Sequence, residues 1–229
     1  MQISGATALV TGANRGLGRH FATQLLERGA TKVYATARRP ELVDLPGVQV
    51  LRLDVTDPVS VTAAARVADD VTLLVNNAGV ATGADLVAGD LDLIRREMDT
   101  HFWGTLAMIR AFAPQLSGGA ILNVLSALSW CAFPGAGGYA AAKAAEWNLT
   151  NAVRLELAAQ RTQVTGLLLG AADTDMMAGR DVPKTDPAVI VKTALDGLEA
   201  GQWEVVADEQ TAFVKASLAG DPQAFYTPQ

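Results

Sequence analysis

The strongest constraint on the fold is a glycine-rich segment near the N-terminus, Thr11-Gly12-Ala13-Asn14-Arg15-Gly16-Leu17-Gly18. It follows a short apolar run at residues 7–10 and opens an amphipathic stretch at residues 17–28. Glycine allows backbone angles that are closed to other residues and lets a phosphate approach the main chain. The first turn of a helix offers free N–H groups and the positive end of its dipole. The segment therefore predicts a dinucleotide-binding strand–turn–helix unit, with an ordinary glycine-rich turn as the alternative.

Strand-like and helix-like segments alternate along the rest of the chain, which indicates βαβ units and a parallel sheet buried on both faces. We expect a single α/β domain over residues 1–229, a doubly wound (Rossmann) fold with seven parallel strands and helices on both faces. The predicted strands are 7–10, 32–37, 48–55, 71–76, 120–125, 163–169 and 203–207, and the predicted helices are 17–28, 56–68, 91–116, 138–160, 187–200 and 209–218.

Composition narrows the range of partners and compartments. The formal charge of −6 argues against nucleic acid and anionic membranes as the main partners. Cys131 is the only cysteine, so an intramolecular disulfide is excluded. The first residues have no signal-peptide pattern and no apolar run is long enough to span a bilayer, so we expect a cytoplasmic protein without a membrane segment. The chain lacks a cluster of ligating residues, and we expect no metal.

The residues after the second predicted strand bear on the choice of cofactor. Folds that prefer NAD place an acidic residue there, which binds the ribose 2′-hydroxyl. This chain instead has Thr36-Ala37-Arg38-Arg39. Arginine binds a 2′-phosphate through charge-assisted hydrogen bonds, whereas a carboxylate would repel it. We therefore expect NADP(H) rather than NAD(H), held first by Arg38 and second by Arg15, with solvated surface arginines as the alternative.

Tyr139 and Lys143 lie one helical turn apart at the start of the helix predicted at 138–160. The i, i+4 spacing places both side chains on one face. A nearby ammonium stabilises the phenolate and is expected to lower the pKa of the tyrosine, which could then exchange a proton with a substrate oxygen. Taken alone, the pair is a weak motif that also arises by chance in helices.

Together, these motifs resemble the short-chain dehydrogenase/reductase family in its compact, single-domain form. The resemblance runs from Thr7 to Ala219. Besides the glycine turn and the tyrosine–lysine pair, it rests on Asn76-Asn77-Ala78-Gly79, on Ser126 placed thirteen residues before Tyr139, and on Gly170 and Thr174.

The resemblance implies a role for each matching residue. Tyr139 would be the general acid in reduction and the base in oxidation, Ser126 would bind the substrate oxygen, and Lys143 would bind the nicotinamide ribose. Asp54 would contact the adenine. The implied cofactor-binding residues are Gly12, Asn14, Arg15, Gly16, Leu17, Gly18, Arg38, Asp54, Val55, Asn76, Ala78, Gly79, Tyr139, Lys143, Gly170, Ala172 and Thr174.

The chain departs from the family pattern at His101. The family has an asparagine in an N-x-x-G-T pattern, whereas this chain reads His101-Phe102-Trp103-Gly104-Thr105. Three interpretations stay open: a structural substitution, an active role of His101 in proton relay, and impaired catalysis. We count His101 among the candidate catalytic residues.

The predicted substrate pocket lies in loops at the carboxyl ends of the strands, where such sheets bind ligands. Its candidate residues are mostly apolar and favour a hydrophobic carbonyl compound; they are Ala81, Leu128, Trp130, Phe133, Ala171 and Met176. Residues 174–186 would form a modest lid.

The sequence thus predicts an NADP(H)-dependent carbonyl reductase that also acts reversibly as an alcohol dehydrogenase. An NAD(H)-dependent alcohol dehydrogenase and a non-catalytic protein that senses the cofactor are the alternatives. The resemblance further implies a homodimer or homotetramer, formed through the helices at 91–116 and 138–160.

Overall fold

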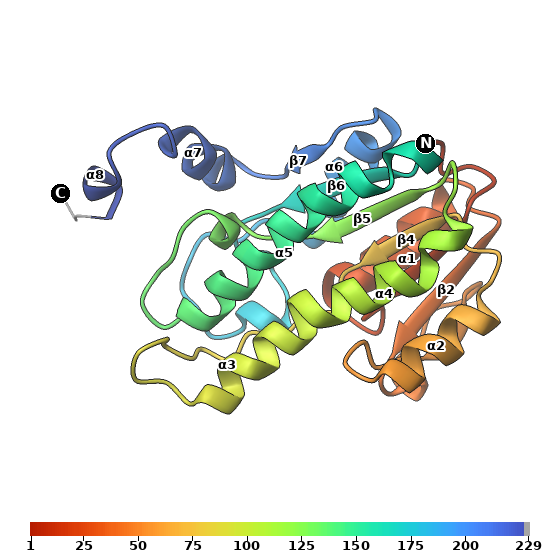
Figure 1. Cartoon of the computed structure of the whole chain (residues 1–229), viewed down its shortest axis with the longest axis horizontal. Helices are drawn as coiled ribbons and strands as arrows, with labels where there is room; N and C mark the ends of the chain where they lie inside the picture. Colours follow the sequence, from red (N-terminus) through yellow and green to blue (C-terminus); the bar gives the residue numbers. More distant parts are fainter. Residues whose placement is uncertain (227–229) are drawn as a thin grey trace.

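The computed structural model describes residues 1–226, so the last three residues of the predicted domain lie outside the description. A sheet of seven parallel strands runs through the molecule in the order β3-β2-β1-β4-β5-β6-β7 (Figure 1). The predicted single-domain, doubly wound fold is confirmed. The strands are β1 (Thr7–Thr11), β2 (Lys32–Ala37), β3 (Gln49–Arg52), β4 (Leu73–Asn76), β5 (Ala120–Val124), β6 (Gln163–Leu168) and β7 (Glu204–Val206).

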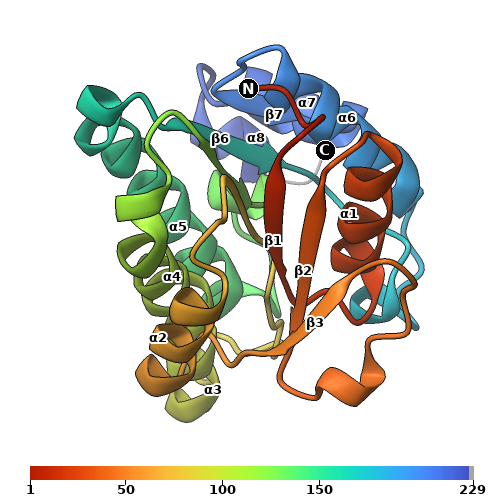
Figure 2. The same ribbon diagram turned by 90° about the vertical axis from the view of Figure 1, so that its right-hand side faces the viewer.

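Helices cover both faces of the sheet (Figure 2). On one face α1 and α6 bury Phe21, Leu25 and Ile190 against the strands. On the other face α2, α4 and α5 bury a second apolar cluster that includes Phe112 and Val153. The helices are α1 (Gly16–Glu27), α2 (Pro58–Val67), α3 (Leu91–Met98), α4 (Thr105–Phe112), α5 (Gly137–Glu156), α6 (Pro187–Glu199), α7 (Glu209–Ser217) and α8 (Pro222–Tyr226).

The strand order reverses at the centre of the sheet. Strand β1 pairs with β2 on one side and with β4 on the other, so the following connections leave in opposite directions. In such sheets the connections diverge at this point and leave a crevice outside the carboxyl ends of the strands. The loops after β1, β2, β4, β5 and β6 meet there.

The helix predicted over residues 91–116 is not a regular α-helix. Its middle, Asp99–Gly104 (η2), is π-helical, and its end, Ala113–Gln115, is a 3₁₀ turn. A π segment widens the helix and often marks a functional site. Apolar periodicity does not reveal such a change in hydrogen bonding, so the sequence pattern missed it. His101 lies inside the π segment.

The C-terminal end was predicted only in part. The predicted helix at 209–218 is present as α7, and a further short helix, α8, follows it. Both lie beyond β7 at one end of the molecule (Figure 1). The Tyr226 hydroxyl in α8 accepts a hydrogen bond of 3.2 Å from the Ala132 N–H, which ties this end to the loop after β5. In residues 1–226 no helix is long and apolar enough to cross a membrane.

Candidate active site

A cavity of about 860 Å³ opens at the carboxyl ends of the strands. Most of the predicted site residues line it, although they come from loops that are far apart in the chain. Those lining the cavity are Gly12, Asn14, Arg15, Gly16, Leu17, Arg38, Asp54, Val55, Ala78, Gly79, Ala81, His101, Ser126, Leu128, Phe133, Tyr139, Lys143, Gly170, Ala171, Ala172, Thr174 and Met176. Gly18, Asn76 and Trp130 do not line it.

The turn after β1 requires glycine at Gly12, Gly16 and Gly18 for different structural reasons. Gly12 and Gly16 have φ angles of +67° and +54°, in the left-handed region that favours glycine. A Cβ atom at Gly12 would also lie 3.1 Å from the Ala78 Cα. Gly18 faces inward instead, because a Cβ there would lie 2.2 Å from the Gly12 carbonyl oxygen. Gly18 therefore permits close packing of α1 against the turn, and its predicted cofactor contact stays a prediction.

The start of α1 offers a site for an anion. Its N-cap residue, Arg15, makes no capping hydrogen bond with its side chain, and its first turn contains no acidic residue. The first N–H groups of the helix are therefore available to a phosphate, which the helix dipole also favours. This is the position at which the sequence predicted a pyrophosphate.

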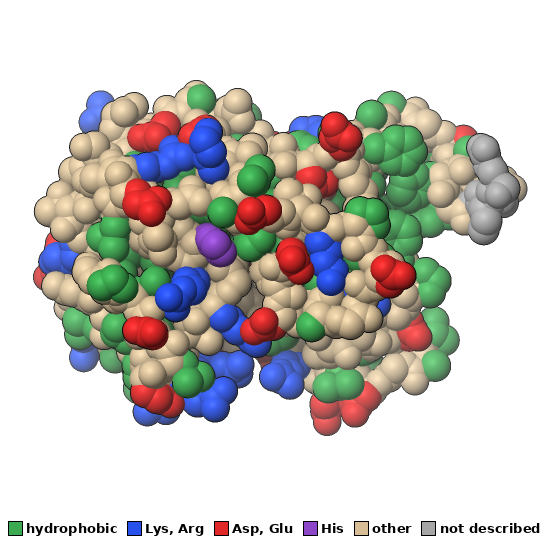
Figure 3. All heavy atoms as spheres, turned by 180° about the vertical axis from the view of Figure 1, so that it is seen from behind, with side chains coloured by type: hydrophobic (Ala, Val, Ile, Leu, Met, Phe, Trp, Pro, Cys, Tyr) green, Lys and Arg blue, Asp and Glu red, His purple; other side chains and the backbone are tan. Residues whose placement is uncertain are grey.

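Two arginines border the cavity where β2 ends. Arg38 and Arg39 follow Ala37, the last residue of the strand, and both line the cavity. Within residues 1–226 neither makes an ion pair of 4.0 Å or less, whereas Arg15 pairs with Asp175 at 3.0 Å. Arg38 can therefore contact an added anion without losing a partner. Figure 3 shows basic side chains interspersed with carboxylates on the face seen from behind.

Of the two asparagines after the fourth strand, the structure brings the second to the cavity. Asn76 is buried, and its amide donates a hydrogen bond of 2.8 Å to the Asn123 side chain. Asn77 lines the cavity, and its amide donates to the Thr11 carbonyl oxygen at 2.8 Å, which joins this loop to the glycine turn. As the last residue of β4, Asn76 directs its side chain into the sheet interior and does not line the cavity, and its cofactor contact stays a prediction.

The candidate catalytic side chains lie together at the other end of the cavity. Tyr139 and Lys143 lie on successive turns of α5, with the Lys143 Nζ 5.8 Å from the centre of the tyrosine ring. Ser126 caps the short turn after β5, and its Oγ accepts a hydrogen bond of 3.1 Å from the Leu128 N–H. Its hydroxyl hydrogen is left to donate toward the cavity.

Burial outweighs the lysine in setting the acidity of Tyr139. Burial raises the pKa of this phenol above its ordinary value. The Lys143 ammonium and the Ser126 hydroxyl lower the pKa, and the Glu146 carboxylate raises it again. The sequence argument expected a lowered pKa because it weighed only the ammonium. At neutral pH the phenol of the free protein is therefore protonated.

His101 packs directly against this pair. Its ring meets the Tyr139 ring edge-on at 5.2 Å, and its Nε2 lies 2.7 Å from the Val80 carbonyl oxygen. Burial and the nearby Lys143 charge hold the pKa of His101 well below its ordinary value, so the imidazole is neutral at neutral pH. Gly79 makes room for the ring, since a Cβ there would lie 2.8 Å from the His101 Cε1.

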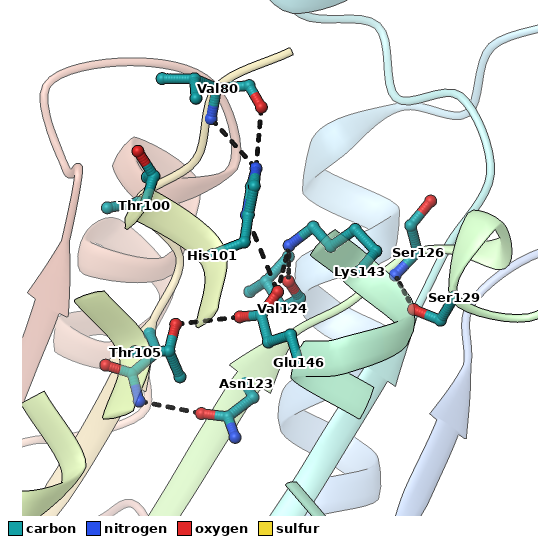
Figure 4. A network of polar contacts seen from close by, with 12 residues as sticks. Val80, Thr100, His101, Thr105, Asn123, Val124, Ser126, Ser129, Lys143 and Glu146 are labelled. Carbon is teal, nitrogen blue, oxygen red and sulfur yellow. Dashed lines mark hydrogen bonds and ion pairs between the residues drawn. The ribbon is translucent and has the colours of Figure 1, made fainter. Parts of the chain in front are cut away.

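The prediction missed Glu146, a buried carboxylate behind the site. It lies one turn beyond Lys143 on the inward face of α5, and its Oε2 accepts a hydrogen bond of 2.7 Å from the Lys143 Nζ. Figure 4 shows Glu146 between Lys143, Thr105 and His101. The available signal was a glutamate three residues after the lysine, on a helical face otherwise rich in alanine.

The pocket side of the cavity is apolar at its wall and open at its mouth. Leu128 and Ala171 line it, and Phe133 and Met176 lie at the mouth with about half of their surface exposed. Trp130 was predicted here, but its ring packs edge-on against Trp147 at 6.4 Å, with the Lys215 ammonium over it. Trp130 packs on Trp147 and therefore does not line the cavity.

The sequence matches the family model described as "short chain dehydrogenase" over residues 6–184. Among curated proteins, it is 35% identical over 181 residues to an NADPH-dependent 1-acyldihydroxyacetone phosphate reductase of Schizosaccharomyces pombe, covering 74% of this chain and 61% of that protein. It is 30% identical to the 1-deoxy-11-beta-hydroxypentalenate dehydrogenase of Streptomyces avermitilis, covering 99% and 86%. The chain thus spans about three-fifths of the length of the yeast relative.

Solved structures share the whole fold. A short chain dehydrogenase from Burkholderia cenocepacia J2315, in complex with NADP, is 41% identical and superposes with a TM-score of 0.95 over 100% of both chains. A short-chain dehydrogenase from Streptomyces avermitilis is 25% identical, with a TM-score of 0.86 over 94% of this chain and 93% of that one.

Proposed function

Because this chain belongs to the short-chain dehydrogenase family of oxidoreductases, we propose that it is an NADP(H)-dependent carbonyl reductase, reversible as an alcohol dehydrogenase. One observation carries the proposal: Ser126, Tyr139 and Lys143 converge in the same cavity as the arginine-bordered glycine turn. Cofactor site and proton donor thus face one space, which is what coupled hydride and proton transfer requires.

The residues of the cavity fit NADP(H). The end of β2 carries Arg38 and Arg39 and no carboxylate, and the start of α1 has free N–H groups for the pyrophosphate. Gly12 has no side chain, so a phosphate can approach the main chain closely there. The Burkholderia structure contains NADP and the yeast relative is named for its NADPH dependence, which supports the same assignment. When bound, the nicotinamide supplies the hydride for reduction and accepts it in oxidation.

The protein's own residues handle the proton. In reduction, Tyr139 gives its phenolic proton to the carbonyl oxygen as that oxygen becomes the alcohol. Ser126 donates a hydrogen bond to the same oxygen and fixes its position. The Lys143 ammonium faces the phenolate that is left and stabilises it. In oxidation the same groups work in reverse.

An apolar ketone or aldehyde suits the substrate side. Ala81, Leu128, Phe133, Ala171 and Met176 present carbon surfaces to the cavity. Burying such surface favours a hydrophobic substrate by roughly 25 cal/mol per Å². Ser126 and Tyr139 then supply the polar contacts for the reacting oxygen.

A panel of aromatic and aliphatic ketones and their alcohols, assayed with NADPH and with NADH by the absorbance of the reduced nicotinamide, tests the proposal. We expect turnover of apolar ketones with NADPH preferred. Tyr139→Phe should lower kcat by about a hundredfold to ten-thousandfold with little change in NADPH affinity. Full activity of this variant on a ketone that the wild type reduces would refute the mechanism.

A cytoplasmic location and a homo-oligomeric state stay predictions from the sequence.

The alternative, a non-catalytic protein that senses the cofactor, would be favoured if one of the catalytic side chains were missing. Ser126, Tyr139 and Lys143 all line the cavity, and this arrangement favours an enzyme.

A further inference from the structure

Two ionisable groups occupy the buried face of α5, where the helix packs on the sheet. Lys143 and Glu146 have side-chain exposures of 5% and 2%, and the Lys143 Nζ lies 2.7 Å from the Glu146 Oε2. Removing charges from water costs several kcal/mol per ion, which is offset only by close pairing and further hydrogen bonds. A lone lysine would suffice to face Tyr139, so the buried carboxylate requires its own explanation.

The carboxylate is held from two sides. Its Oε1 accepts a hydrogen bond of 3.0 Å from the Thr105 hydroxyl, at the start of α4, while its Oε2 accepts from Lys143. Figure 4 shows Thr105 and Lys143 on opposite sides of Glu146. Lys143 also donates to the Val124 carbonyl oxygen at 2.7 Å. An ammonium has three N–H groups, so one is left for the side of Tyr139.

His101 lies beside this carboxylate as a neutral group. Its Nδ1 lies 3.7 Å from the Glu146 Oε2 and has no hydrogen-bond partner in residues 1–226. The Nε2 lies 2.7 Å from the Val80 carbonyl oxygen and 3.3 Å from the Val80 backbone nitrogen, so its role as donor or acceptor depends on the tautomer. In either tautomer the neutral imidazole adds no charge beside Glu146.

We propose, resting on the reductase function above, that Glu146 is a positioning residue whose negative charge and hydrogen bonds keep the Tyr139 phenol and the Lys143 ammonium both protonated. The pair is then set to give a proton to a carbonyl, and reduction persists into alkaline solution. Glu146 touches neither substrate nor cofactor and acts through Lys143.

The sign of the effect does not depend on which member of the pair titrates first. A negative charge beside two coupled acids disfavours the loss of a proton from either of them. Four ionisable neighbours face Tyr139 or its partner: Lys143 and Glu146 on α5, His101 on η2 and Glu97 on α3. Glu146 raises the pKa of both Tyr139 and Lys143. Burial raises the pKa of Glu146 itself, whereas the Lys143 ammonium at 2.7 Å and the Thr105 hydroxyl favour its ionised form. His101 is neutral, and only Glu97 acts in the same direction as Glu146 on Tyr139.

The first experiment compares Glu146→Gln with the wild type over pH, using kcat/KM for reduction of any ketone that the panel identifies. Glutamine keeps the shape and can still accept from Lys143, but it removes the charge. We expect the alkaline limb of the pH profile to shift to lower pH by about one unit or more. Glu146→Asp, which restores the charge, should return the limb toward its original position.

The chain offers a matched control for the loss of one negative charge. Asp70 contacts Lys32 and the Tyr34 hydroxyl near the surface, so it forms a second group of tyrosine, lysine and carboxylate away from the cavity. Asp70→Asn changes the net charge by the same amount as Glu146→Gln. It should leave the pH profile of reduction unchanged.

A second measurement needs no substrate and so separates this proposal from the proposed function. Three tyrosines are present, and the ultraviolet difference between a protein and its Tyr139→Phe counterpart isolates the Tyr139 titration. We expect its midpoint to fall in Glu146→Gln. An unchanged or raised midpoint, in a variant with wild-type circular dichroism, overturns the role of Glu146 even if ketones are reduced. If no ketone is reduced but the Tyr139 midpoint is lowered in Glu146→Gln, the proposed function is overturned and the role of Glu146 stands.

Discussion

At the scale of single residues, the site combines charges that oppose one another. Burial raises the pKa of Tyr139, Lys143 lowers it, and Glu146 partly cancels the lysine. The tyrosine–lysine motif therefore describes only part of the electrostatics. Glu146, on the same helix, and His101, on another helix, also lie beside the pair. Acid–base behaviour follows from the whole group.

Arg38→Ala should reduce the preference for NADPH. A charged hydrogen bond to the 2′-phosphate contributes about 1.5–3 kcal/mol, so the KM for NADPH should rise by roughly tenfold to a hundredfold while that for NADH changes little. Steady-state kinetics with both cofactors measures this. Arg66→Ala, in the last turn of α2, is the control. An unaltered ratio of kcat/KM for the two cofactors would show that Arg38 does not bind the 2′-phosphate.

His101 should make the stability of the protein depend on pH. Its pKa in the folded state lies well below the ordinary value of 6.5, so the unfolded chain binds a proton more readily. The free energy of unfolding should then fall as the pH drops below about 6.5, by up to about 1.4 kcal/mol per pH unit. Denaturant unfolding measures this slope, and His101→Asn should make it shallower. Equal slopes in the two proteins would contradict the buried neutral imidazole.

The same variant bears on the relay hypothesis. An active relay requires His101 to take up a proton during turnover, whereas a structural role requires only its packing. If His101→Asn leaves the pH–rate profile of reduction unchanged, the relay hypothesis fails.

At the scale of elements, turns and one irregular helix bring the groups together. The glycine turn joins β1 to α1 with Gly18 packed directly on the Gly12 carbonyl oxygen. The π segment of residues 99–104 carries His101 into the site, and Thr105 follows it to hold Glu146. These positions depend on close backbone approach, which regular helices alone would not provide.

Gly18→Ala should destabilise the protein although this glycine does not line the cavity. Its Cβ would lie 2.2 Å from a backbone oxygen, so α1 or the turn must shift. We expect a loss of about 1–3 kcal/mol in unfolding free energy and a lower Tm. Gly220→Ala, in an exposed C-terminal turn, serves as the control for thermal unfolding by circular dichroism. An unchanged Tm in Gly18→Ala would contradict this packing.

At the scale of the whole molecule, we propose that apolar side chains outside the cavity take part in self-association. Trp103 on η2 is 57% exposed, and Leu91 on α3 and Leu155 on α5 are exposed as well. Large exposed apolar side chains on neighbouring helices are typical of an interface between protein chains. The family resemblance implied an oligomer through these same helices, and this stays a prediction.

Trp103→Glu should shift a homodimer or homotetramer toward the monomer. A charge in an apolar interface loses its hydration without gaining a partner. Light scattering after size-exclusion chromatography measures the mass at several concentrations. Trp203→Glu, which changes another exposed tryptophan near β7, is the matched control. A wild-type protein that elutes as a monomer at all concentrations would contradict the prediction.

Much of the fold and the site follows from local patterns. The alternation of apolar strands with amphipathic helices determined the parallel sheet, because a strand buried on both faces leaves an uninterrupted apolar run. The glycine turn, Arg38 and the tyrosine–lysine spacing follow from local geometry along one or two elements. Of these residues, Gly12, Gly16, Arg38, Tyr139 and Lys143 line the cavity.

The tertiary structure decided what depends on contacts between distant segments. Asn77 rather than Asn76 reaches the cavity because the end of β4 turns one amide inward. Trp130 packs on Trp147, and the π segment brings His101 against Tyr139. Burial reversed the expected direction of the Tyr139 pKa, and Glu146 became visible only as the partner of Lys143. Desolvation and pairing are properties of the packed interior, so a linear pattern of residue types could not reveal them.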